Sequence, residues 1–179
     1  SGESGIGKTQ IALEYAYCYK DEYRAVLWAK ANSPEILMSD LVSTADALNL
    51  PEKSDSDQGR VVKAVKQWLQ SHQSWLLILD SIEDKDVEKI YNFLLKECTG
   101  DILLTTRTQI VEENVVNLFL IDPMDKEEGI ALILQRANIL EAKEPITHAS
   151  EQNQIEAEAI VNEMGGLPLA LEQAGAYIK

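Results

Sequence analysis

The chain has 179 residues, of which 45% are hydrophobic and 26% are charged, so its composition is that of a folded domain and not of a disordered segment. Its formal charge of −14 opposes binding to nucleic acid or to an anionic membrane, because phosphate-bearing surfaces attract clustered Lys and Arg. We therefore expect neither nucleic acid nor a membrane among its partners.

Cysteine usage and hydropathy indicate the compartment. Cys18 and Cys98 both lie in apolar segments and offer no disulfide framework, which fits a reducing environment. No apolar run approaches the roughly 18 residues of a membrane span, and no signal peptide is visible. We expect a cytoplasmic protein.

The first nine residues contain a glycine-rich phosphate-binding pattern. From Gly2 to Thr9 the sequence satisfies G-x-x-x-x-G-K-[ST]. Glycines at 2, 5 and 7 let consecutive backbone N–H groups converge on an anion. Lys8 would supply charge for the β- and γ-phosphates, and Thr9 a hydroxyl for Mg²⁺. The alternative is a glycine-rich turn that binds nothing.

A phosphate loop normally connects a buried strand to a helix. The helix is predicted over residues 11–20, with the positive end of its dipole at the loop, but no strand precedes Ser1. We therefore expect the natural polypeptide to extend upstream. For a polypeptide that begins at Ser1, we expect a rearranged sheet or a strand donated by a partner, together with a poorly ordered phosphate loop.

The next segments alternate between strand and helix patterns. Residues 24–30 are β-branched and aromatic, which predicts a strand. Ser33 and Pro34 form a helix start, and an apolar stripe follows at helical spacing until residue 48. After a polar loop, a second helix is predicted from Arg60 to about Ser71.

Residues 75–80 read WLLILD, five apolar residues followed by an acid. A strand that is apolar on both faces belongs in the middle of a parallel sheet, and Asp80 would emerge at its carboxyl end. Phosphate-loop proteins place a Mg²⁺-binding carboxylate there. An apolar strand that ends in Asp is common by itself, but together with the loop it predicts a metal site.

A helix is predicted from about Asp86 to Lys96, followed by a strand in DILLTTR, residues 101–107. Arg107, at the carboxyl end of that strand, can reach a γ-phosphate, and the alternative is an ordinary surface arginine. Residues 115–121, VVNLFLI, form the last predicted strand.

The remaining sequence is helical. We predict helices over residues 125–140, 155–164 and about 167–179, with a rigid turn at Gly165-Gly166-Leu167-Pro168. The alternative for this turn is a plain helix junction. The pattern predicts an α/β nucleotide-binding domain of residues 1–122 and a small helical domain of residues 123–179.

Four ordered segments resemble one family. GESGIGKTQIALEYAY, WLLILD, GDILLTTR and GGLPLALEQAGAYI, in this order, are similar to the NB-ARC module of STAND-class signalling ATPases. This class includes apoptotic activators, plant disease-resistance proteins and many bacterial and fungal proteins. The last segment is most similar to bacterial and fungal members that often carry tetratricopeptide repeats downstream.

The resemblance implies a phosphate-loop NTPase fold, truncated at its first strand, that binds ATP or ADP with Mg²⁺. Thr9 and Asp80 would serve the metal, and Lys8, Asp80 and Arg107 the chemistry, with Arg107 distinguishing ATP from ADP. Pro168 would press the helical domain against the base or sugar. The implied nucleotide-binding residues are Gly2, Glu3, Ser4, Gly5, Ile6, Gly7, Lys8, Thr9, Gln10, Arg107 and Pro168.

One position departs from the family pattern. Family members usually carry a second acid directly after the strand-end Asp, and here that position is Ser81, with Glu83 or Asp84 as possible substitutes. Because that acid orients the attacking water, we expect at most a slow ATPase. The resemblance then implies a nucleotide-dependent switch that self-associates and works with other domains of its parent protein. The alternatives are a turnover-competent ATPase or phosphotransferase, and a degenerate interaction scaffold.

Overall fold

The computed structural model describes residues 1–83, 86–90, 98–107 and 117–178. By internal contacts the chain divides into two compact units. The first comprises Ser1 and Lys8–Leu118, and the second comprises Gly2–Gly7 and Phe119–Lys179. The phosphate loop is thus grouped with the helical part of the chain, and the boundary expected at residue 122 stays a prediction.

The first unit is built on a parallel sheet. Its described strands are β1 (Ala25–Lys30), β2 (Trp75–Ile82) and β3 (Asp101–Thr106), in the order β1-β2-β3. The central strand β2 is buried from Trp75 to Asp80, as its uninterrupted apolar sequence predicted. The predicted α/β architecture is confirmed.

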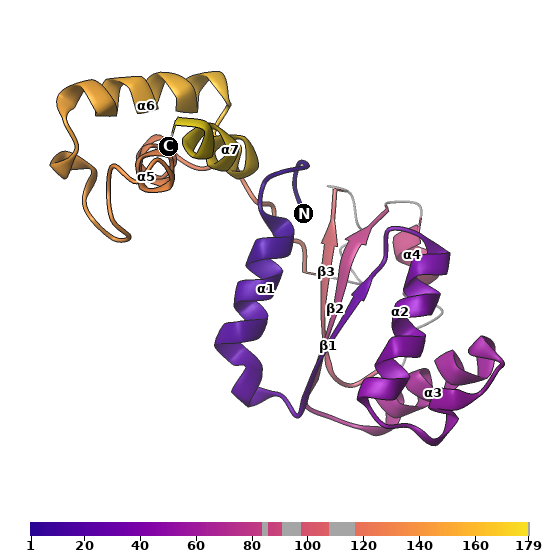
Figure 1. The fold of residues 1–179 in the computed structure, drawn as a ribbon. Coiled ribbons are helices and arrows are strands. Elements are labelled where there is room, and N and C mark those ends of the chain that lie inside the picture. Colours follow the sequence, from indigo (N-terminus) through magenta and orange to yellow (C-terminus); the bar gives the residue numbers. More distant parts are fainter. Residues whose placement is uncertain (84–85, 91–97, 108–116, 179) are drawn as a thin grey trace. The chain divides into compact units, whose positions relative to one another are not determined.

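Helices cover both faces of this sheet (Figure 1). On one face, α1 (Lys8–Tyr19) packs two small side chains, Ala12 and Ala16, against β2. On the other face, α2 (Pro34–Ala47) and α3 (Gln58–Ser71) form the larger core with alternate residues of the same strand. Three short helices lie between these elements: η1 (Lys20–Glu22), η2 (Pro51–Ser54) and α4 (Val87–Ile90).

Side-chain caps fix where the helices of this unit begin. The Ser33 hydroxyl accepts a hydrogen bond from the Ile36 N–H, and Pro34 occupies the first helical turn, as predicted. Helix α3 begins at Gln58, two residues before the predicted Arg60, because the Asp57 carboxylate accepts from the Gly59 N–H.

One prediction for this part of the chain is corrected, whereas the expectation of a rearranged sheet or a donated strand and a poorly ordered phosphate loop, made for a polypeptide that begins at Ser1, stays a prediction. The three described strands lie side by side in the order β1-β2-β3. The strand predicted over residues 115–121 is wrong for residues 117–121, which join no sheet, while 115 and 116 lie outside the described residues. Strand propensity gives way where no neighbouring strand supplies backbone partners. Of the helix predicted over residues 86–96, only Val87–Ile90 is described, and 91–97 lie outside the description.

The second unit contains α5 (Lys126–Arg136), η5 (Ile146–His148), α6 (Glu151–Glu163) and α7 (Pro168–Ile178), around a core that includes Ile133, Leu134 and Leu171. Asp125 and Glu128 form a capping box at the start of α5. The helix ends at Arg136 instead of the predicted residue 140, because Asn138 takes the left-handed conformation (φ 58°). Helix α6 begins at Glu151, earlier than predicted, because Ser150 caps the Asn153 N–H.

Candidate functional site

Three polar side chains meet at the carboxyl end of the sheet. Thr9 stands in the first turn of α1, Asp80 in β2 and Thr105 in β3. The Thr9 hydroxyl donates to Asp80 Oδ1 at 2.9 Å, and the Thr105 hydroxyl donates to the same oxygen at 2.6 Å. Asp80 is only 8% exposed. The two neutral hydroxyl donors hold its carboxylate in one orientation.

Two basic side chains share this end of the sheet. Burial and the nearby positive charge of Arg107 lower the pKa of Lys8 below its usual value, while the Asp80 carboxylate acts in the opposite direction. Arg107 directly follows β3 and is exposed. Four of the predicted residues, Lys8, Thr9, Asp80 and Arg107, therefore lie at the same end of the sheet in the first unit, where the positive charge of Arg107 acts on Lys8.

The phosphate loop itself is described within the second unit. Gly5 (φ 84°) and Gly7 (φ 96°) take conformations that side chains disfavour, as expected of a loop that turns its amides toward an anion. A Cβ added at Gly7 would meet nothing within 4 Å, so no protein atom fills the space on that side of the backbone. Glu3 and Ser4 are exposed, whereas the Ile6 side chain is buried and anchors the loop.

The loop contacts the first turn of α7. The Leu169 N–H, which directly follows the predicted Pro168, donates to the Gly5 carbonyl at 3.2 Å. A Cβ on Gly5 would lie 3.4 Å from the Leu169 Cβ, so the two backbones approach closely. Pro168 thus begins a helix whose first turn touches the phosphate loop.

Sequence reasoning missed Thr105. It follows the apolar part of β3, at a position whose side chains lie beside the end of the neighbouring strand. Of the residues considered as substitutes for a second acid, Glu83 is described as partly buried and Asp84 lies outside the described residues. Ser81 itself is exposed and has φ 64°.

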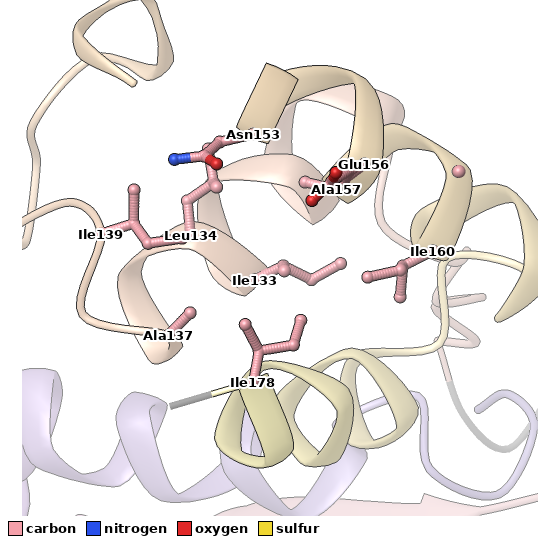
Figure 2. A pocket seen from close by; sticks show the side chains of 10 residues that line it. Ile133, Leu134, Ala137, Ile139, Asn153, Glu156, Ala157, Ile160 and Ile178 are labelled. Carbon is pink, nitrogen blue, oxygen red and sulfur yellow. The ribbon is translucent and has the colours of Figure 1, made fainter. Parts of the chain in front are cut away.

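A separate pocket lies among the helices of the second unit (Figure 2). It encloses about 390 Å³, and Ile133, Ile160 and Ile178 point into it from α5, α6 and α7. Glu156 is the charged residue of its lining, and a carboxylate repels phosphate. This pocket is therefore unsuited to the anionic part of a nucleotide.

Two kinds of feature are absent from the described residues. In the described ranges, His, Cys, Asp and Glu side chains nowhere gather in a group of three or more that could hold a metal ion. Of the helices in the described part of the chain, none is long and apolar enough to cross a membrane.

Comparison with known proteins gives a family match and two distant relatives. The model of the NB-ARC domain family matches residues 1–140. The chain is 24% identical, over 99% of its length, to a nucleotide-binding leucine-rich repeat (NLR)-like protein of Hyaloscypha variabilis, and 26% identical, again over 99%, to the transcription activator GutR of Bacillus subtilis. These alignments cover 19% and 24% of the two relatives, so the chain spans about a fifth to a quarter of their length.

Proposed function

Since the chain belongs to the NB-ARC family and is a nucleotide-binding signalling module, we propose that it is an ATP/ADP-dependent conformational switch with slow or absent hydrolysis. The observation that carries the proposal is the 2.9 Å hydrogen bond between Thr9 and Asp80, which are 71 positions apart in the sequence. It joins the phosphate-loop threonine to the acid at a strand end, the two protein groups that phosphate-loop proteins use for Mg²⁺.

The residues present fit a magnesium nucleotide. The open backbone at Gly7 and the left-handed Gly5 suit the close approach of phosphate oxygens, and Lys8 offers a charge to them. Thr9 and Asp80 would hold Mg²⁺, which takes few protein ligands and completes its shell with phosphate oxygens and water. When bound, the ion neutralises phosphate charge. Arg107, beside Lys8, would respond to the presence of the γ-phosphate.

The proposal of slow hydrolysis rests on Ser81. Attack on a γ-phosphate requires a positioned water, and the residue after Asp80 has a hydroxyl in place of the expected carboxylate. A hydroxyl is a far weaker base than a carboxylate at neutral pH, so binding would survive while turnover falls. A working ATPase or phosphotransferase is the second candidate, favoured by the partly buried Glu83 two residues further on.

The contact of the loop with α7 supports a switch. A ligand that reshapes the loop would act on the Gly5 carbonyl and hence on the Leu169 N–H that it binds. The loop also continues directly, at Gly7–Lys8, into the first helix of the other unit. Nucleotide exchange would therefore change the conformation of both units. We propose that this conformational change controls self-association of a cytoplasmic, multidomain parent protein.

Calorimetric titration of the full-length protein with ADP and ATP in Mg²⁺ tests the proposal. We expect binding to wild-type protein and to Lys63→Ala, a control on the exposed surface of α3, and loss of binding in Lys8→Ala. Single-turnover hydrolysis should be very slow, and assembly should depend on which nucleotide is bound. Rapid turnover would favour the ATPase, and absence of binding to wild-type protein at millimolar nucleotide would refute both.

A further inference from the structure

Thr105 makes two short hydrogen bonds with consecutive residues of β2. Its hydroxyl donates to Asp80 Oδ1 at 2.6 Å and accepts from the Ser81 N–H at 2.7 Å. Thr105 is 5% exposed and Asp80 is 8% exposed. A hydroxyl has one hydrogen and two lone pairs. Since the Ser81 N–H uses a lone pair and the Asp80 carboxylate accepts the hydrogen, the Thr105 hydroxyl acts as a fixed donor to Asp80.

The need for this side chain comes from an irregularity in the sheet. Leu79 pairs with Leu104 and Ile82 pairs with Thr106, so Asp80 and Ser81 together oppose the single residue Thr105. Ser81 has φ 64° at this bulge. A bulge interrupts the backbone ladder and redirects the side chains next to it. The Thr105 hydroxyl replaces the lost ladder bond at the Ser81 N–H and holds Asp80 where the bulge directs it.

The hydroxyls of Thr9 and Thr105 bind the same carboxylate oxygen. Thr9 can keep its hydrogen on Asp80 while offering a lone pair to a cation. Thr105 lies in β3, and both of its hydrogen bonds connect it to β2. It therefore contacts the carboxylate without belonging to the phosphate loop. This separates the two threonines: one is suited to touch a metal, and the other to orient the metal's carboxylate.

We propose that Thr105 is a positioning residue that orients the Asp80 carboxylate for the Mg²⁺ of a bound nucleotide. The inference rests on the proposed nucleotide-binding function and adds to it a residue that acts through Asp80. Residues that orient metal-binding carboxylates typically change metal affinity by about 10- to 100-fold when they are removed. The effect should therefore appear only when Mg²⁺ takes part in binding.

The test compares three variants of the full-length protein by calorimetric titration with ADP, in Mg²⁺ and in EDTA. Thr105→Val removes the hydroxyl, Thr105→Ser keeps it, and Thr106→Val is the matched control. Thr106 is the next residue, 6% exposed, and its hydroxyl donates to the Ile82 carbonyl at 3.0 Å instead of to Asp80.

We expect Thr105→Val to weaken ADP binding in Mg²⁺ by about 10-fold or more, and to shift half-saturation to higher Mg²⁺, with the affinity in EDTA unchanged. Thr105→Ser should restore binding, and Thr106→Val should leave it unchanged in both buffers. Thermal melts identify any variant that unfolds. If Thr105→Val does so, Thr105→Ala carries the same comparison without placing an additional methyl group beside the carboxylate.

An unchanged affinity of Thr105→Val in Mg²⁺, or an equal loss in Mg²⁺ and EDTA, would overturn the inference while leaving the nucleotide site intact. If wild-type protein binds ADP neither in Mg²⁺ nor in EDTA, the proposed function is overturned, and the inference with it. The wild-type titration therefore distinguishes the two failures.

Discussion

The turn between α6 and α7 contains adjacent glycines whose surroundings differ, so two alanine substitutions separate backbone strain from steric overlap. Gly165 has φ +62° and Gly166 has φ +68°. A Cβ added at Gly165 meets nothing within 4 Å, but at Gly166 it would lie 2.6 Å from the Met124 carbonyl oxygen and 3.2 Å from the Pro123 Cβ. Only Gly166 is therefore required by packing as well as by conformation.

The two costs can be estimated separately. A non-glycine residue in the left-handed region costs about 1–2 kcal/mol, and we expect Gly165→Ala to lower the free energy of unfolding by this amount. Gly166→Ala adds an overlap worth about 1–3 kcal/mol and strains the hydrogen bond from the Met124 N–H to the Gly166 carbonyl, which measures 2.9 Å. For Gly166→Ala we therefore expect a loss of about 2–5 kcal/mol.

Urea unfolding followed by two probes measures the difference. Trp28, Trp68 and Trp75 all belong to the first unit, so tryptophan fluorescence reports on the sheet. Far-ultraviolet circular dichroism also reports on the helices of the second unit, where the loss should appear. Equal destabilisation by Gly165→Ala and Gly166→Ala would refute the reasoning, because it would mean that the contact with Pro123 and Met124 contributes nothing.

Two further predictions concern the first unit. A Cβ at Gly100 would lie 2.3 Å from the ring of the fully buried Trp75, so Gly100→Ala should lower the free energy of unfolding by about 1–3 kcal/mol or more in urea titrations. At Gly59, in the first turn of α3, a Cβ would lie 3.1 Å from the end of the exposed Asp57 side chain, and alanine favours the helix, so Gly59→Ala should destabilise less. Equal stability of the two variants would contradict this. The pKa of Lys8 is lowered in the free protein by burial and by Arg107, and a polyphosphate favours the charged amine, so binding takes up a proton at alkaline pH. Nucleotide affinity should therefore fall as pH rises through the lowered pKa, as measured by calorimetry in buffers of different ionisation enthalpy, and Lys8→Arg should lose this dependence because its guanidinium does not titrate there. A pH-independent affinity of wild-type protein would count against this role of Lys8.

Local sequence signals predicted the elements that determine the site. The apolar run before Asp80 required burial on both faces of a sheet, and Ser33-Pro34 defined a helix start, because both depend on neighbouring residues alone. The end of α5 was misplaced because an apolar pattern continues to Leu140 while Asn138 turns the backbone away. The patterns that succeeded are those in which propensity and burial agree.

The role of Thr105 could not be predicted in the same way. It depends on a bulge that places Asp80 and Ser81 opposite one residue, and such a register change depends on two strands that are 25 positions apart. The sequence alone shows a threonine at a strand end, which is compatible with many roles. The hydrogen bond to Asp80 exists only because the register brings the two side chains together.

The size of the contact between the phosphate loop and α7 limits how the proposed switch can work. A single hydrogen bond such as that from the Leu169 N–H to the Gly5 carbonyl contributes about 0.5–1.5 kcal/mol, which changes an equilibrium by roughly 2- to 13-fold. Moving a switch from mostly closed to mostly open requires about 5.5 kcal/mol of differential binding. The loop contact is too weak for this alone. Under the proposed function, most of the difference would come from contacts that the nucleotide itself makes, and we propose Lys8 and Arg107, whose charges act on each other, as the groups that respond to phosphate charge. The bond at Gly5 would then transmit to α7 a change that the phosphates have already brought about.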